Sequence, residues 1–82
     1  MKILVNVYVP AVGERYDVLV PDSVRIRSAV SLIAGAVEEL SGHRYVSSGV
    51  ECLCSAEKNI RLKSSTTLKK YGIQNGDHLI IM

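Results

Sequence analysis

The feature that most constrains the fold is an uncharged apolar run at residues 79–82, which follows a tight turn at residues 75–77. A strand formed by this run has two apolar faces. Such a strand belongs inside a sheet, because at an edge its unpaired backbone would promote aggregation. We therefore expect a strand over residues 78–82 in the middle of its sheet, preceded by a short turn of helix over residues 67–71.

The first twenty residues predict a β-hairpin. Two segments alternate apolar and polar residues, and a short loop with a proline and a glycine separates them. Pairing Ile3 with Val20 keeps both apolar sets on one face, whereas a slip of one residue would bring polar side chains into the core. The same register places a small apolar pair, Leu4 with Leu19, on the outer face.

The middle of the chain predicts one long amphipathic helix. Asp22 and Ser23 are expected to cap its first turn, and Gly42 is expected to end it. A membrane-surface role is disfavoured, because the polar face is mixed in charge rather than basic. The apolar stripe that should face the core consists of Ile26, Ala29, Val30, Ile33, Val37 and Leu40.

Two further strands are expected after this helix. Residues 43–49 have no periodicity and are predicted to form a loop. Residues 50–54 alternate and predict a third strand, and residues 60–62 predict a short fourth strand at the sheet edge. In the third strand the expected inward side chains are Val50, Cys52 and Cys54, and the outward ones are Glu51 and Leu53.

Size and charge limit the function classes. With 82 residues, of which 48% are hydrophobic, the chain has room for one domain, residues 1–82. It contains neither an apolar stretch long enough to span a membrane nor a signal peptide pattern, so a cytoplasmic protein without direct membrane insertion is expected. The net charge of +2 forms no basic stripe, and the only aromatic residues are four tyrosines, which disfavours nucleic acid as a partner.

No constellation for catalysis, cofactors or metal is evident. Cys52 and Cys54 are interpreted as buried free thiols, since a disulfide between residues two apart on a strand has poor geometry; a redox role is left open. Zinc would need two more ligands, and His43 and His78 belong to different elements. There is no glycine-rich phosphate loop and no pair of facing carboxylates, so we predict no enzyme, no cofactor and no catalytic residue.

Two segments resemble ubiquitin. Residues 67–74, Thr-Leu-Lys-Lys-Tyr-Gly-Ile-Gln, resemble its Thr-Leu-Ser-Asp-Tyr-Asn-Ile-Gln, and residues 1–5, Met-Lys-Ile-Leu-Val, resemble its Met-Gln-Ile-Phe-Val. The order of a hairpin, one long helix and further strands is that of the β-grasp fold. The resemblance implies an α+β, ubiquitin-like β-grasp fold with a mixed four- to five-stranded sheet packed on one long helix.

A narrower resemblance concerns the helix start and the last strand. Val20-Pro21 and the pattern Tyr71-x-Ile73-x-Asn75-Gly76-Asp77-x-Leu79 resemble the YukD/EsaB family of Firmicutes-type type VII secretion systems. This resemblance implies an accessory or regulatory component of a type VII (ESX/WXG100) system. Conjugation or sulfur transfer would need a flexible tail ending in Gly-Gly, and no glycine follows Gly76, so a non-conjugated protein-interaction module is expected.

The resemblance to ubiquitin also implies a binding site. Leu53, Ile80 and Met82 take the places of the isoleucine, histidine and valine of its apolar patch. The outer pair of the predicted hairpin, Leu4 with Leu19, is expected to form a secondary site. We expect this face to bind membrane-anchored secretion components, and Leu53→Asp to abolish capture without unfolding.

Other interpretations of these residues remain open. The loop at residues 43–49 could cover them, or they could simply be scattered. The alternative function is a homo-oligomeric structural β-grasp module without a secretion role, in which the same face forms a homodimer.

Overall fold

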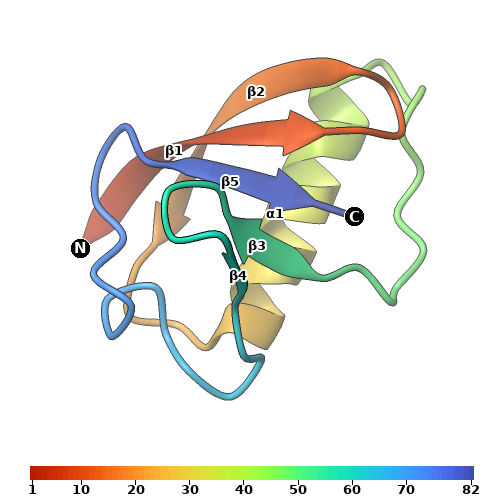
Figure 1. The fold of residues 1–82 in the computed structure, drawn as a ribbon. Coiled ribbons are helices and arrows are strands. Elements are labelled where there is room, and N and C mark those ends of the chain that lie inside the picture. Colours follow the sequence, from red (N-terminus) through yellow and green to blue (C-terminus); the bar gives the residue numbers. More distant parts are fainter.

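The computed structural model describes residues 1–82, which form five strands and one helix (Figure 1). The sheet has the strand order β2-β1-β5-β3-β4, so β5 lies in its middle, as predicted. It is a mixed sheet, because β5 runs parallel to β1 and antiparallel to β3. The elements are β1 (Lys2–Val9), β2 (Glu14–Pro21), α1 (Ile26–Leu40), β3 (Leu53–Ser55), β4 (Ile60–Arg61) and β5 (His78–Ile81).

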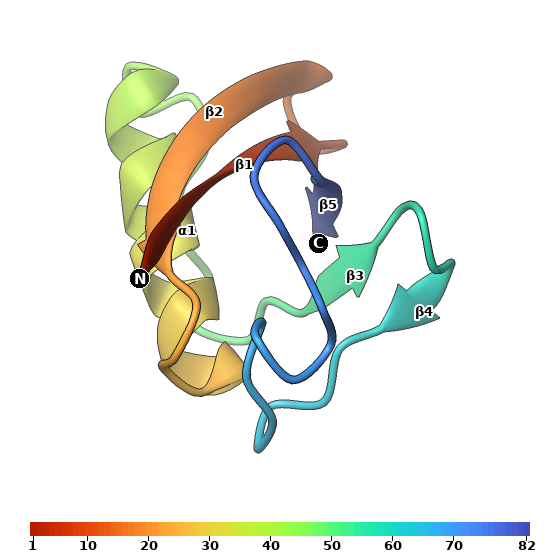
Figure 2. The ribbon, with the colours of Figure 1, turned by 90° about the vertical axis from the view of Figure 1, so that its left-hand side faces the viewer.

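Helix and sheet form two layers, with α1 across one face of the sheet (Figure 2). The core between them contains 18 buried apolar residues. Every second residue of β1, from Ile3 to Val9, points into it, and so do Leu79 and Ile81 of β5. This arrangement is the predicted α+β, ubiquitin-like β-grasp fold, and the opposite face of the sheet is free of any covering layer.

The predicted register of the first hairpin is confirmed. Ile3 lies opposite Val20 and Leu4 opposite Leu19 in an antiparallel pair that extends over all eight residues of each strand. Each strand therefore has one face that can be buried.

The start of α1 differs from the prediction, because neither Asp22 nor Ser23 caps it. The backbone amide of Ile26 instead donates to the carbonyl of Thr66 at 2.7 Å, and the next amide donates to the carbonyl of Ser64 at 3.1 Å. Since the free amides of a first helical turn need acceptors, a segment distant in sequence satisfies them here. The first turn of the helix is thereby tied to the loop that precedes β5.

The helix buries most of its predicted stripe and ends as expected. Gly42 has φ +63°, in the left-handed region that follows many helices. The prediction that Leu40 faces the core was wrong, since this side chain is 57% exposed, and Val30 is only partly buried. Ala34 is buried in addition. Residues 67–71 form hydrogen-bonded turns rather than the predicted short helix.

The facing of β3 is opposite to the prediction. Leu53 is fully buried, whereas Val50 is 85% exposed. The reason is the register with the central strand, because Leu53 lies opposite the buried Ile81 and must share its face. Cys52 and Cys54 consequently point to the outer face, where both are half-buried rather than in the core.

Candidate protein-interaction face

The outer face of the sheet, opposite α1, faces the viewer in Figure 1. One row of directly paired residues crosses all five strands on this face. At one end of the row, the Arg15 guanidinium lies 4.9 Å from the centre of the Tyr8 ring, within cation–π distance. From β2 to β4 the row consists of Arg15, Tyr8, Ile80, Cys54 and Arg61.

An apolar hollow lies beside the middle of this row. Its apolar lining consists of Cys54, Ala56, Ile60, Ile80 and Met82, which we call the β5 patch, and the hollow has a volume of about 330 Å³. Met82 is 59% and Ile60 41% exposed, while Ile80 and Cys54 are half-buried. The patch is held by paired strands, so it is preorganised rather than carried on a loop.

The predicted secondary site is a separate patch. Leu4 and Leu19 lie side by side and are 44% and 58% exposed. A polar pair separates them from the β5 patch, because the Asn6 amide donates to the Asp17 carboxylate at 3.1 Å. The sheet face therefore presents two apolar areas with a polar strip between them.

Leu53, predicted as the centre of the site, does not belong to this surface. Its side chain is fully buried in the core, so it cannot touch a partner, and Leu53→Asp would place a charge in the core and unfold the protein rather than test binding. Cys54 takes the outward position opposite Ile80. Ile60 was missed by the prediction, because a two-residue strand is too short to show any alternation.

The two thiols on this face are free. Burial raises the pKa of the Cys54 thiol, and the neighbouring Cys52 raises it further, while Arg61 acts in the opposite direction. No group of three or more histidine, cysteine, aspartate or glutamate side chains is placed to hold a metal ion. Cys54 is thus a protonated, weakly nucleophilic group at neutral pH.

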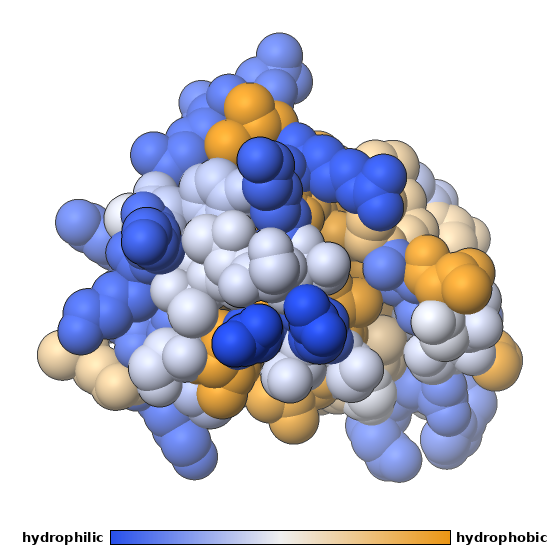
Figure 3. Space-filling model, turned by 90° about the horizontal axis from the view of Figure 1, so that it is seen from below, coloured by the Kyte–Doolittle hydropathy of each residue, from blue (hydrophilic) through white to orange (hydrophobic).

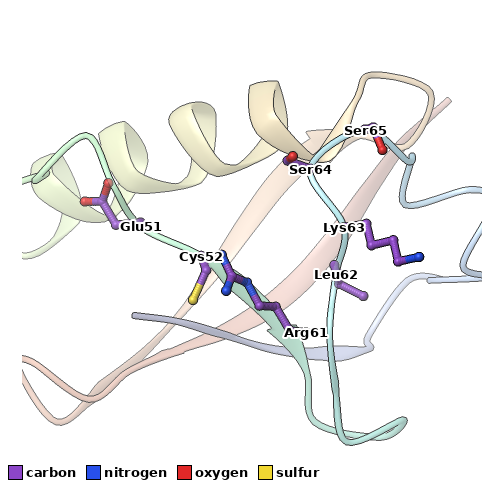
Figure 4. Close-up of a pocket in the computed structure, with 7 residues that line it drawn as sticks. All are labelled: Glu51, Cys52, Arg61, Leu62, Lys63, Ser64 and Ser65. Atoms are coloured by element: carbon purple, nitrogen blue, oxygen red, sulfur yellow. The ribbon is translucent and has the colours of Figure 1, made fainter.

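A second hollow, of about 390 Å³, lies between residues 51–52 and residues 61–65 (Figure 4). Most of the residues that line it are polar or charged, with Arg61 and Lys63 on one side and Glu51 on the other. The lower end of the molecule, where the helix begins, is also mainly hydrophilic, with only small separate apolar areas (Figure 3). These surfaces contrast with the apolar β5 patch.

The Glu51 carboxylate is already hydrogen-bonded within the protein. Its carboxylate accepts hydrogen bonds from the Tyr45 hydroxyl at 2.6 Å, the Ser48 amide at 2.7 Å and the Gly49 amide at 3.0 Å. Partial burial by itself would raise the pKa of Glu51, but the hydrogen bonds from Tyr45, Ser48 and Ser47 outweigh it and lower the pKa to about 2. Burial and the same carboxylate raise the pKa of Tyr45. The carboxylate therefore anchors the loop before β3 and is not available to a ligand.

Solved structures with the same fold are ubiquitin-like. The ubiquitin-like domain of Plasmodium falciparum Dsk2 matches with a TM-score of 0.70, 20% identity and complete coverage of both chains. Ubiquitin of Caldiarchaeum subterraneum matches with a TM-score of 0.69 and 15% identity over 99% of this chain and 91% of its own. A ubiquitin-like domain from Arabidopsis thaliana gives 0.69 and 18% over 99% and 76%. These likenesses establish the fold.

The family is established by sequence. No curated protein is similar enough in sequence to count as a relative. The single helix, α1, is not long and apolar enough to cross a membrane. The sequence model of the family described as "WXG100 protein secretion system (Wss), protein YukD" matches residues 4–81, nearly the whole chain. This ubiquitin-like chain therefore belongs to the YukD family of the WXG100 secretion system.

Proposed function

We propose that this protein is a cytoplasmic accessory or regulatory component of a WXG100 secretion system that binds a membrane-anchored component through the β5 patch. The observation that carries the proposal is this patch itself: an apolar hollow on the central strands, on the face that α1 leaves uncovered. Apolar areas of this kind, rimmed by polar residues, mark protein interfaces. Family membership identifies the WXG100 secretion system, and the patch indicates that the protein acts by binding another protein.

The surroundings of the patch indicate which partner chemistry would fit. Arg15 and Arg61 stand at the two ends of the row that runs through Ile80. A partner segment that inserts a large apolar side chain into the hollow and carries carboxylates on either side would match both features, since arginine pairs well with carboxylate. We therefore propose an apolar anchor with acidic neighbours as the partner motif.

A binding role is proposed in preference to catalysis. The Cys54 thiol has a raised pKa, which works against a nucleophile. The nearest histidine on β5 is engaged elsewhere, because the His78 ring lies 2.6 Å from the Glu57 carboxylate. Neither group supports a nucleophile and base pair on this face.

The test is a pull-down of the tagged protein from native cytoplasm and solubilised membranes, with the captured proteins identified by mass spectrometry. Met82→Asp puts a charge into the patch at an exposed position and should leave the fold intact. Leu32→Asp is the matched control, because Leu32 is 50% exposed on the distant helix. Membrane-anchored components of the WXG100 machinery should be captured by the wild type and the control but not by Met82→Asp.

Other outcomes decide against the proposal. If Met82→Asp captured the same partners as the control, the β5 patch would not be part of the interface. Recovery of only the protein itself would favour a homo-oligomeric structural module, and light scattering would then show a dimer that Met82→Asp dissociates.

A further inference from the structure

Three sulfur-bearing side chains lie near one another on the outer face of the sheet. Cys52 and Met82 lie directly opposite each other, because the Cys52 amide donates to the Met82 carbonyl at 2.9 Å and the Met82 amide donates back at 3.1 Å. In such a pair the Cα atoms are about 5.5 Å apart and both side chains stand on the same face. Figure 4 shows the Cys52 sulfur pointing away from α1, toward that face.

Cys54 completes the group. It lies two residues after Cys52 along an extended segment, so the two thiols share one face of the sheet. Cys54 also lines the same hollow as Met82. Backbone pairing thus places Cys52 beside Met82, and the shared hollow places Cys54 beside Met82.

We propose that Cys52, Cys54 and Met82 form a binding site for a soft monovalent metal ion of the copper(I) type, held by two thiolates and one thioether. Thiolate and thioether sulfur select copper(I), whereas hard cations require oxygen ligands. A structural zinc site needs four ligands in a tetrahedron, and the outer face provides no further thiolate, imidazole or carboxylate at this position. Three sulfur ligands suit an ion of low coordination number.

The charges of the site balance on binding. Each thiol loses its proton as its sulfur bonds to copper(I), so one monovalent ion releases two protons and leaves a site with one net negative charge. No oxidation or reduction takes place. Arg61 lies opposite Cys54 on β4 and supplies the compensating positive charge. Both cysteines are free and half-exposed, so the ion has access to them.

The experiment is an anaerobic titration of the purified, reduced protein with copper(I) in competition with a chromophoric chelator. One ion per chain should bind to the wild type, with release of about two protons in weakly buffered solution. Cys52→Ser and Cys54→Ser should each lose more than about 100-fold in affinity, the upper end of the loss seen when even an outer-shell partner is removed. Met82→Leu should lose about tenfold or more.

Tyr8→Phe is the matched control, since it alters the same face outside the hollow, retains all three sulfur ligands and should bind as the wild type does. Circular dichroism of each variant verifies the fold. Absence of binding by the wild type, or affinity retained by either cysteine variant, would overturn the site. An unchanged affinity of Met82→Leu would overturn the three-sulfur arrangement. The titration needs no secretion partner, so its result is independent of the proposed function.

Discussion

Replacing Glu51 by glutamine would test the carboxylate that anchors the loop between α1 and β3. In the wild type this carboxylate accepts hydrogen bonds from the Tyr45 hydroxyl and from the amides of Ser48 and Gly49. Glutamine has nearly the same size but offers one oxygen and one NH₂ group. At least one of the loop donors would therefore face another donor, and the loop would lose part of its attachment.

The magnitude follows from the pKa of Glu51, which is lowered from 4.5 to about 2. At about 1.36 kcal/mol for each pKa unit, this difference corresponds to an upper limit of about 3.4 kcal/mol in the free energy of unfolding. The carboxylate is only partly buried, and solvent screens it. We therefore expect Glu51→Gln to lower the free energy of unfolding by roughly 2 kcal/mol at pH 7.

The effect should depend on pH with a definite sign. The folded-state pKa of Glu51 is lower than its unfolded value, so the stabilisation is fully present above pH 4.5 and is lost as the pH falls toward 2. The difference between wild type and variant should accordingly shrink through this window. Urea unfolding followed by circular dichroism at pH 7, 4.5 and 3 would measure it.

Glu39→Gln is the matched control, because it removes the same charge from an exposed position on α1. Its effect should stay within about 0.5 kcal/mol, as is usual for surface substitutions. If Glu51→Gln were no more destabilising than Glu39→Gln at pH 7, or if its effect were constant down to pH 3, the anchoring role of the carboxylate would be refuted.

Further predictions concern the core and the turns, and urea unfolding can test all of them. Leu53→Ala should cost about 2–5 kcal/mol because the side chain is fully buried, and Leu40→Ala, at an exposed position, should cost far less. A similar loss in both would contradict the assigned facing of β3. Gly76→Ala should destabilise the protein by about 1–2 kcal/mol because φ is +85° there. Gly35→Ala on the open surface of α1 should instead stabilise by roughly 0.5–1 kcal/mol, and effects of the same sign would refute this reasoning.

Local patterning determined the parts of the fold that the sequence predicted well. The first hairpin has two long alternating segments, so a slip between Ile3 and Val20 would have moved a whole apolar set to the wrong face. The central place of β5 followed from its two apolar faces. In each case the information lies within the segment itself or in its neighbour along the chain.

The errors arose where distant segments decide the local structure. The alternation of residues 50–54 allows either set of side chains to face the core. Only the pairing with β5 places Leu53 inside and Cys54 outside. The start of α1 was also mispredicted, because its amides bond to carbonyls about forty residues away at Thr66 and Ser64. For the candidate site, the positions Ile80 and Met82 were on the expected face, but the participation of Ile60 depends on the two-residue strand β4, which leaves no pattern in the sequence.

The central position of β5 has a consequence for synthesis on the ribosome. Until residues 78–81 emerge, β1 and β3 have no partner between them, and the sheet consists of two separate halves, β2-β1 and β3-β4. The hollow of the β5 patch also lacks Ile80 until then. A nascent chain therefore cannot offer this surface to a partner before residues 78–81 have left the ribosome and β5 has paired with β1 and β3.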